Sequence, residues 1–174
     1  FVPRLKARGL GGQIVNTASM ASFLAGSIGG IYTTTKFAVR GLSESLRWAL
    51  APHGIGVSCL CPGAVKSPSY GQAVQSEDSA REDAAFHEEF LACMAVLHEY
   101  GMEPDAVADC AIDGIRRNLL YIFPHAEYRD ELRAMFDEII DSFPVRGADA
   151  DVRDSAFAER RRRTGAVLRR RRGH

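Results

Sequence analysis

Cysteines are few in this sequence, and their spacing does not fit a zinc site. Only four occur in 174 residues. Cys59 and Cys61 alternate along an apolar stretch, while Cys93 and Cys110 each stand alone. Structural zinc needs close pairs of Cys or His ligands, and the histidines are scattered without ligand spacing. We therefore expect no bound metal, and buried, reduced thiols as in a cytoplasmic protein.

Long apolar runs are also missing from the chain. No stretch approaches the ~20 apolar residues that a membrane-spanning helix needs. A serine hydrolase is poorly supported as well, because Ala25-Gly26-Ser27-Ile28-Gly29 is one residue short of the Gly-x-Ser-x-Gly elbow and lies well after its strand. These absences argue against a membrane span and against hydrolase chemistry.

Glycine is abundant, yet a phosphate-binding glycine turn is not found. The two dense glycine stretches cover residues 9–12 and 26–30. Neither opens a helix after a strand with an acidic residue downstream, which is how a dinucleotide pyrophosphate is held. The chain also begins at Phe1 without an initiating Met. We expect it to be the C-terminal part of a longer protein.

Strand and helix patterns alternate along the chain. Strands are expected over residues 13–17, 56–61 and 119–123, and helices over 1–7, 31–51, 78–98, 104–118 and 127–142. Such alternation with short connections predicts an α/β fold with a parallel sheet. If the chain stands alone, the strand over 13–17 has lost its inner neighbours, and its apolar edge is open to pairing with other chains.

The helix over residues 31–51 shows an amphipathic pattern. Its apolar residues fall at positions 38, 42, 46, 49 and 50, while Arg40, Glu44 and Arg47 lie on another face. This spacing is typical of a helix that packs its apolar side against the core.

Three polar residues form a candidate proton-transfer site. Tyr32 and Lys36 are four residues apart, so they share one face of the helix, and an ammonium beside a phenol favours the phenolate. Ser19 follows the strand over 13–17, and ligands of open parallel sheets bind at the carboxyl ends of the strands. Its hydroxyl is placed to hold a substrate oxygen while Tyr32 moves the proton.

These segments resemble the short-chain dehydrogenase/reductase family in order and spacing. The resemblance covers residues 12–19, the Tyr-x-x-x-Lys pair at 32–36, and residues 37–42, 54–58 and 62–63. It implies that Tyr32 is the acid/base, that Ser19 polarises the carbonyl or alcohol, and that Lys36 also binds the nicotinamide ribose. The implied reaction is hydride transfer between NAD or NADP and an alcohol or ketone.

The loop after the second strand also fits the family. The resemblance implies that the backbone of Val65 and the hydroxyl of Ser67 meet the nicotinamide carboxamide, in a loop that begins with Pro62 and Gly63. Ser67 stands where the family has threonine, which keeps the hydroxyl and loses a methyl group.

The resemblance further implies a Rossmann-like, doubly wound parallel sheet. The chain would hold only its C-terminal part, without the N-terminal cofactor-binding strands, and would be inactive by itself. Residues 1–145 are expected to form this part of a single domain, and residues 146–174 a flexible Arg-rich tail. The family also implies a homo-oligomer.

The resemblance implies that the long stretch over residues 62–101 forms a mobile substrate loop and lid. Phe86, Phe90, Met94 and Leu97 recur at helical spacing and either cover a hydrophobic substrate or close the core. Residues 97–104 and 120–124 resemble a subgroup that oxidises the benzylic alcohol of lignin-type aryl ethers. An aromatic alcohol is therefore one expected substrate.

Positive charge is concentrated at the C-terminus. Residues 155–174 hold eight Arg and one Glu, whereas residues 1–154 hold 14 basic and 21 acidic side chains. Such a block is typical of a solvated tail. The alternative to an enzyme is therefore an inactive remnant or binding module whose arginines contact polyanions. No aromatic residue interleaves the arginines, so a nucleic-acid partner is not favoured.

Overall fold

A parallel sheet forms the centre of the computed structural model, which describes residues 1–26, 29–66, 91–92, 94–96, 98–144, 147, 153–155, 157–160 and 162. Its strands are β1 (Gly12–Thr17), β2 (Ile55–Leu60) and β3 (Tyr121–Ile122), in that order. β1 and β2 pair over their whole length, while β3 meets only Cys59 and Leu60. The predicted α/β fold with a parallel sheet is confirmed.

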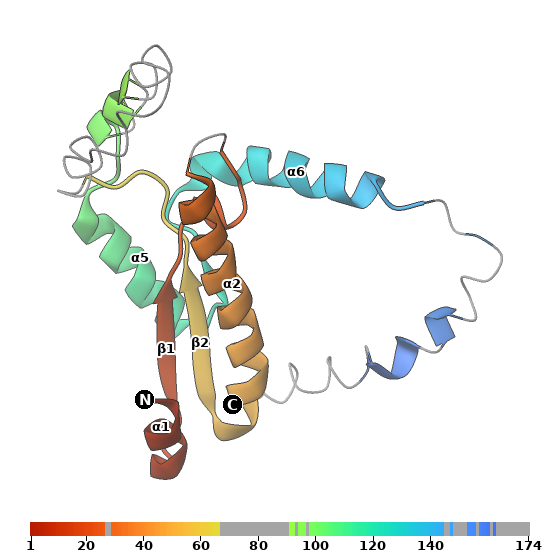
Figure 1. Ribbon diagram of the computed structural model, residues 1–174. Helices are drawn as coiled ribbons and strands as arrows, with labels where there is room; N and C mark the ends of the chain where they lie inside the picture. The colour runs from red at the N-terminus through yellow and green to blue at the C-terminus, as the bar shows by residue number, and fades with distance from the viewer. Residues whose placement is uncertain are drawn as a thin grey trace.

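Helices lie on both sides of these strands (Figure 1). They are α1 (Val2–Arg8), α2 (Gly30–Leu50), α5 (Pro104–Arg116) and α6 (Arg129–Asp141), with short 3-10 turns η1 (Met20–Ser22), η2 (Ala51–His53) and η4 (Ala126–Tyr128). The predicted bounds differ from these by a few residues at most. Most of the helix expected over 78–98 lies outside the described residues.

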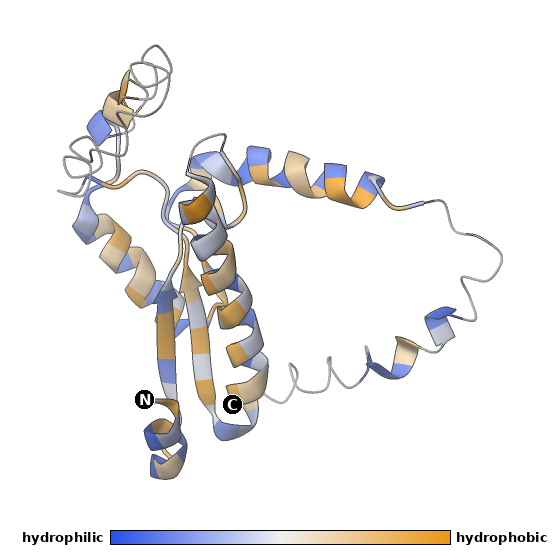
Figure 2. Cartoon of the chain, in the orientation of Figure 1, coloured by the Kyte–Doolittle hydropathy of each residue, from blue (hydrophilic) through white to orange (hydrophobic). Residues whose placement is uncertain are grey.

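Strand β2 is the most buried element of the chain. Five of its six residues are buried, because β1 and β3 pair with its edges and α2 and α5 contact it. Two apolar clusters form around it: one contains Met20, Phe23 and Cys61, and the other contains Leu50 and Ile55. Hydrophobic colour accordingly runs along the strands and α2 in Figure 2. The apolar run around Cys59 and Cys61 thus makes a core strand, and both thiols are buried and free.

The orientation expected for α2 is wrong in part. Leu46 and Leu50 pack on the core as predicted, but Ala38, Leu42 and Ala49 are exposed. Arg40 and Arg47, which were expected on the other face, also turn inward. Their guanidinium groups supply hydrogen bonds that backbone carbonyls there need.

Arg47 shows how this works. β3 pairs only with Cys59 and Leu60, so the carbonyl of Val57 has no partner on that strand. The Arg47 guanidinium donates to the Val57 carbonyl at 2.8 Å and to the carbonyl of Asn118 at 2.8 Å. Asn118 lies two residues after the end of α5 and has a φ of 51°. Arg47 therefore ties α2, β2 and the approach to β3 together.

The free edge of β1 agrees with the sequence expectation. Within the described ranges β1 pairs only with β2, and Val15 is 37% exposed. No helix in this part of the chain is both long and apolar enough to cross a membrane. Most of residues 146–174 lie outside the described residues. In the described part of this segment, residues 153–155 and 157–160 are helical. The Arg-rich tail and its polyanion binding therefore stay predictions.

Candidate active site

Ser19 lies where β1 and β2 end. The backbone N–H of Ala18 donates to the Leu60 carbonyl at 2.8 Å, and that of Met20 donates to the Pro62 carbonyl at 2.8 Å. These two bonds fix the chain on either side of Ser19. Its hydroxyl accepts from the N–H of Ala21 at 3.2 Å and donates to the Pro62 carbonyl at 3.5 Å. Ser19 is thus held at the carboxyl edge of the sheet, as predicted.

Tyr32 and Lys36 reach the same edge from the first turns of α2. The Lys36 ammonium lies 5.4 Å from the centroid of the Tyr32 ring and donates to the carbonyl of Thr17, the last residue of β1, at 3.4 Å. Tyr32 is 53% exposed, so its hydroxyl is open to a substrate. Among the described residues, no hydrogen bond joins Tyr32 directly to Ser19. The expected i,i+4 pairing is nevertheless present.

Residues 62–65, here called the 62–65 loop, leave β2 at this edge. Val65 forms a parallel bridge with Met102, whose N–H donates to the Ala64 carbonyl at 3.0 Å. Gly63 packs so closely on the ring of Tyr128 that a Cβ there would collide with it. A glycine is therefore needed at position 63 because of this contact, and not because of a positive backbone φ. Ser67, the last predicted loop residue, lies outside the described residues.

His125 belongs to this site, and the sequence analysis missed it. The imidazole is 4% exposed and contacts the 62–65 loop through both ring nitrogens. Its position three residues after β3 was the available signal, because polar residues at the carboxyl ends of parallel strands gather at one edge. The sequence analysis considered the histidines only as metal ligands, which their spacing does not fit.

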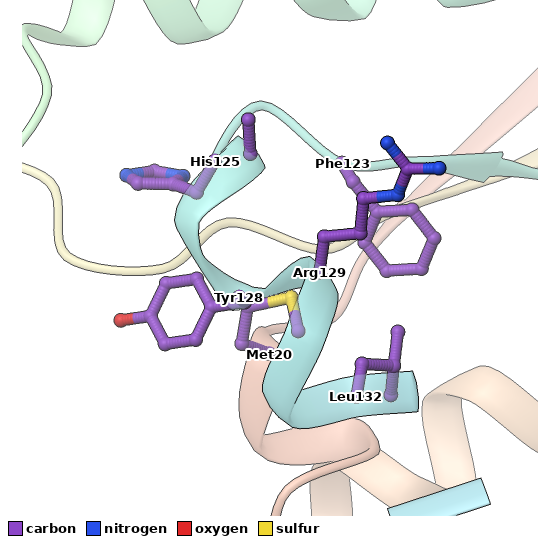
Figure 3. Close-up of a pocket in the computed structure, with 7 residues that line it drawn as sticks. Met20, Phe123, His125, Tyr128, Arg129 and Leu132 are labelled. Carbon is purple, nitrogen blue, oxygen red and sulfur yellow. The ribbon is translucent and has the colours of Figure 1, made fainter. Parts of the chain in front are cut away.

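A pocket of about 320 Å³ opens beside His125 (Figure 3). Met20, one residue after Ser19, forms one wall of the pocket, and the lining is mainly apolar. Its other walls come from the segment after β3 and from α6: Phe123, His125, Ala126, Tyr128, Arg129 and Leu132. Burial raises the pKa of the Tyr128 phenol, and the nearby carboxylates of Glu127 and Glu131 add to this. The Tyr128 hydroxyl therefore stays protonated near neutral pH.

Comparison with known proteins supports the family resemblance. The sequence profile described as "short chain dehydrogenase" matches residues 1–78. The C alpha-dehydrogenase of a Sphingobium species is 33% identical over 153 residues, which are 87% of this chain and 50% of that protein. A short-chain dehydrogenase structure from Novosphingobium aromaticivorans is 39% identical with a TM-score of 0.73, over 98% of this chain and 54% of that one.

The chain belongs to the short-chain dehydrogenase/reductase family. A further family structure, from Burkholderia phymatum in complex with NAD, is 26% identical with a TM-score of 0.66 and covers 84% of this chain and 55% of that one. The chain spans about half the length of curated relatives that it matches over most of its own length. The family is that of oxidoreductases with a Rossmann fold, and the three parallel strands with their helices fit this fold.

Proposed function

We propose that this chain is the catalytic and substrate-binding half of an NAD(P)-dependent oxidoreductase that interconverts an alcohol and a ketone. The observation that carries the proposal is the placement of Lys36 between the Tyr32 ring and the Thr17 carbonyl, next to Ser19 at the carboxyl edge of the sheet. This places a proton donor, a cation and a hydroxyl at the edge where ligands of such sheets bind.

In this mechanism Tyr32 moves the proton. In the oxidation direction the alcohol O–H proton passes to the Tyr32 phenolate oxygen, and in reduction the phenol returns it to the carbonyl oxygen. The Ser19 hydroxyl donates a hydrogen bond to the same substrate oxygen and holds it near the phenol. The positive charge of Lys36 stabilises the phenolate and attracts the ribose hydroxyls. The nicotinamide, when bound, exchanges the hydride with the substrate carbon.

The residues present suit a nicotinamide but not a whole dinucleotide. One edge carries Tyr32, Lys36, Pro62, Gly63 and Val65, and Ser67 follows Val65 by two residues in the sequence. The turn and helix that hold a pyrophosphate are not found among the described elements, and β1 has an open edge where further strands fit. We propose that additional N-terminal strands complete the sheet and choose between NAD and NADP.

An aromatic alcohol is the proposed substrate. The pocket that includes Met20, the residue after Ser19, is lined mainly by apolar and aromatic side chains, including Phe123 and Tyr128. Such a wall favours a ring over a small polar ligand, because apolar burial contributes about 25 cal/mol per Å². A benzylic alcohol places its ring in the pocket and its hydroxyl beside Ser19.

We propose a cytoplasmic homo-oligomer that buries the outer face of α2. Ile31, Ala38, Leu42 and Ala49 are exposed at helical spacing, with Ile31 85% and Leu42 55% accessible. We call this stripe the outer face of α2. An exposed apolar stripe of this kind is typical of a surface that meets a partner.

The decisive test uses the protein as its native cell makes it, purified through a C-terminal affinity tag. Its intact mass is expected to lie well above 19.0 kDa, the mass of this chain. Tyr32→Phe should then lower kcat for an aryl alcohol by roughly 10²–10⁴-fold with little change in cofactor Kd, because general acid–base catalysis is lost. Tyr100→Phe, at an exposed tyrosine, is the matched control. Full turnover by Tyr32→Phe would rule out the proposed role.

A further inference from the structure

His125 makes two hydrogen bonds to consecutive residues of the 62–65 loop. The N–H of Gly63 lies 3.0 Å from Nδ1, and the carbonyl of Ala64 lies 2.8 Å from Nε2. A backbone N–H only donates, so Nδ1 must be the acceptor; a carbonyl only accepts, so Nε2 must carry the hydrogen. The two contacts together assign the neutral imidazole with its proton on Nε2.

Protonation of His125 is incompatible with one of these contacts. The imidazolium carries a hydrogen on both nitrogens, so Nδ1–H would point at the N–H of Gly63. The bond to Gly63 is then lost, while the bond from Nε2 to Ala64 remains. The N–H of Gly63 then faces another N–H in place of an acceptor and must find a new partner, which requires the loop to move.

Gly63 depends on this bond more than its neighbours do. The Ala64 carbonyl also accepts from Met102, and the Pro62 carbonyl accepts from Met20. Within the described ranges Gly63 is otherwise held only by packing on Tyr128, whose ring forms an edge-to-face contact with His125 at a centroid distance of 6.1 Å. The N–H of Gly63 is therefore held by a single ring nitrogen.

The charged and titratable groups around His125 come from three elements. Tyr128 and Arg129 line the same pocket. Glu127 and Glu131 lie close enough to Tyr128 to act on its pKa. Lys66, just beyond the loop, is paired with Glu103 at 2.6 Å. None of these groups hydrogen-bonds the imidazole within the described residues, whereas both loop contacts do.

We propose that His125 is a positioning residue that holds Gly63 in place for the nicotinamide, and that protonation of His125 releases Gly63. Low pH would then loosen the 62–65 loop and weaken dinucleotide binding without touching Ser19, Tyr32 or Lys36. The loop contact itself needs no cofactor. Its effect on dinucleotide binding rests on the proposed function.

The loop contact is tested by NMR on the protein labelled with ¹⁵N. Long-range ¹H–¹⁵N spectra at high pH should show His125 as the Nε2–H tautomer. As pH falls and His125 protonates, the exchange protection factor of the Gly63 amide should drop by roughly tenfold, because one hydrogen bond is lost. The Met102 amide, which bonds Ala64 independently of His125, is the internal reference and should keep its protection.

Two variants and a control complete the test. His125→Asn places an amide oxygen near the Nδ1 position and cannot titrate, so Gly63 should stay protected at every pH. His125→Phe keeps the ring without any acceptor, and Gly63 should be unprotected at every pH. His53→Asn, at an exposed histidine on η2, should behave as wild type. If His125→Phe does not fold, the tautomer and the His125→Asn profile still decide.

A Gly63 amide whose protection is unchanged while His125 titrates, or an Nδ1–H tautomer, would overturn the proposal. The cofactor arm measures Kd for NADH and NADPH by fluorescence on the native-source protein at each pH. Affinity should fall at low pH for wild type and stay constant for His125→Asn. Wild-type protein that binds neither dinucleotide at any pH would count against the proposed function, while the NMR result would still judge the loop contact.

Discussion

The two faces of α2 are not a simple apolar inside and polar outside. The face toward the sheet carries Arg40, Ser43 and Arg47 beside the core residues Leu46 and Leu50, whereas the outer face carries Ala38 and Leu42. On the inner face each polar group has a defined partner; for example, Asn16 donates to the Ser43 hydroxyl at 3.0 Å, and that hydroxyl donates to the Val39 carbonyl at 2.7 Å. Burial of polar groups is tolerated where hydrogen bonds are satisfied.

The inner face also supports the aromatic side of the core. Arg40 lies 3.9 Å over the centroid of the Phe23 ring and pairs with Glu44 at 2.9 Å. Glu44 in turn accepts from the hydroxyl of Tyr121 at 2.5 Å, which connects α2 to β3. The inner face thus positions the strands that carry the site, while the apolar outer face is free to meet another chain. Four substitutions separate these two roles.

Lys36→Met should have the largest effect, at the end of the inner face that reaches the site. Removing the ammonium leaves Tyr32 without its adjacent positive charge and the Thr17 carbonyl without its donor. We expect kcat/KM to fall by roughly 10²–10³-fold, together with a raised cofactor Kd. Steady-state kinetics on the native-source protein measure this. Lys6→Met, in the last turn of α1, is the control, and an equal loss there would contradict a local role.

Arg47→Met should have the next largest effect, on stability. It removes the donors to the carbonyls of Val57 and Asn118, which are partly buried. We expect a loss of about 2–3 kcal/mol in the free energy of unfolding, measured by urea denaturation. Arg117→Met removes only an exposed ion pair with Asp113 and should change stability by under about 0.5 kcal/mol. Similar losses for both variants would show that Arg47 acts only as a surface charge.

Leu42→Asp tests the outer face. A charge in the middle of the proposed interface should weaken self-association at least tenfold while leaving the fold intact, because an apolar contact is replaced by a buried carboxylate. Sedimentation equilibrium gives the association constant, and circular dichroism checks the fold. Ile112→Asp changes an exposed apolar residue on α5 and should leave association unchanged. Association that survives Leu42→Asp would place the interface elsewhere.

Tyr121→Phe should have the smallest effect at neutral pH and a clear signature at high pH. Burial, reinforced by Glu44, raises the pKa of Tyr121 from its ordinary 10.0 to about 12. Between these values the unfolded chain has lost the proton and the folded chain keeps it, so stability falls as pH rises from about 10 to 12. Denaturation across this range should show a steeper fall for wild type than for Tyr121→Phe. Parallel curves would mean that Tyr121 titrates normally.

Much of the site could be read from the sequence because it follows local rules. The spacing of Tyr32 and Lys36 places both on one side of a helix, and the strand before Ser19 places its hydroxyl at a carboxyl edge. His125 could not be found this way. Its partners, Gly63 and Ala64, lie more than 60 residues away, and nothing in their types shows which nitrogen faces which loop atom.

The predicted orientation of α2 was wrong in part for a related reason. Periodicity showed that the helix has two unlike faces, but it cannot show which one meets the sheet. Because β3 is short, the carbonyl of Val57 has no partner on that strand. Arg47 donates to it instead, which places the Arg47 side chain toward the sheet.

By itself the sequence determined the alternation of strands and helices and the pairing of Tyr32 with Lys36, because short-range periodicity governs both, and the order of its motifs carried the family resemblance. Only the tertiary structure decided which face of α2 is buried and that His125 holds the 62–65 loop. Both depend on hydrogen bonds between segments that are distant along the chain, and such bonds form only when the strands have brought those segments together.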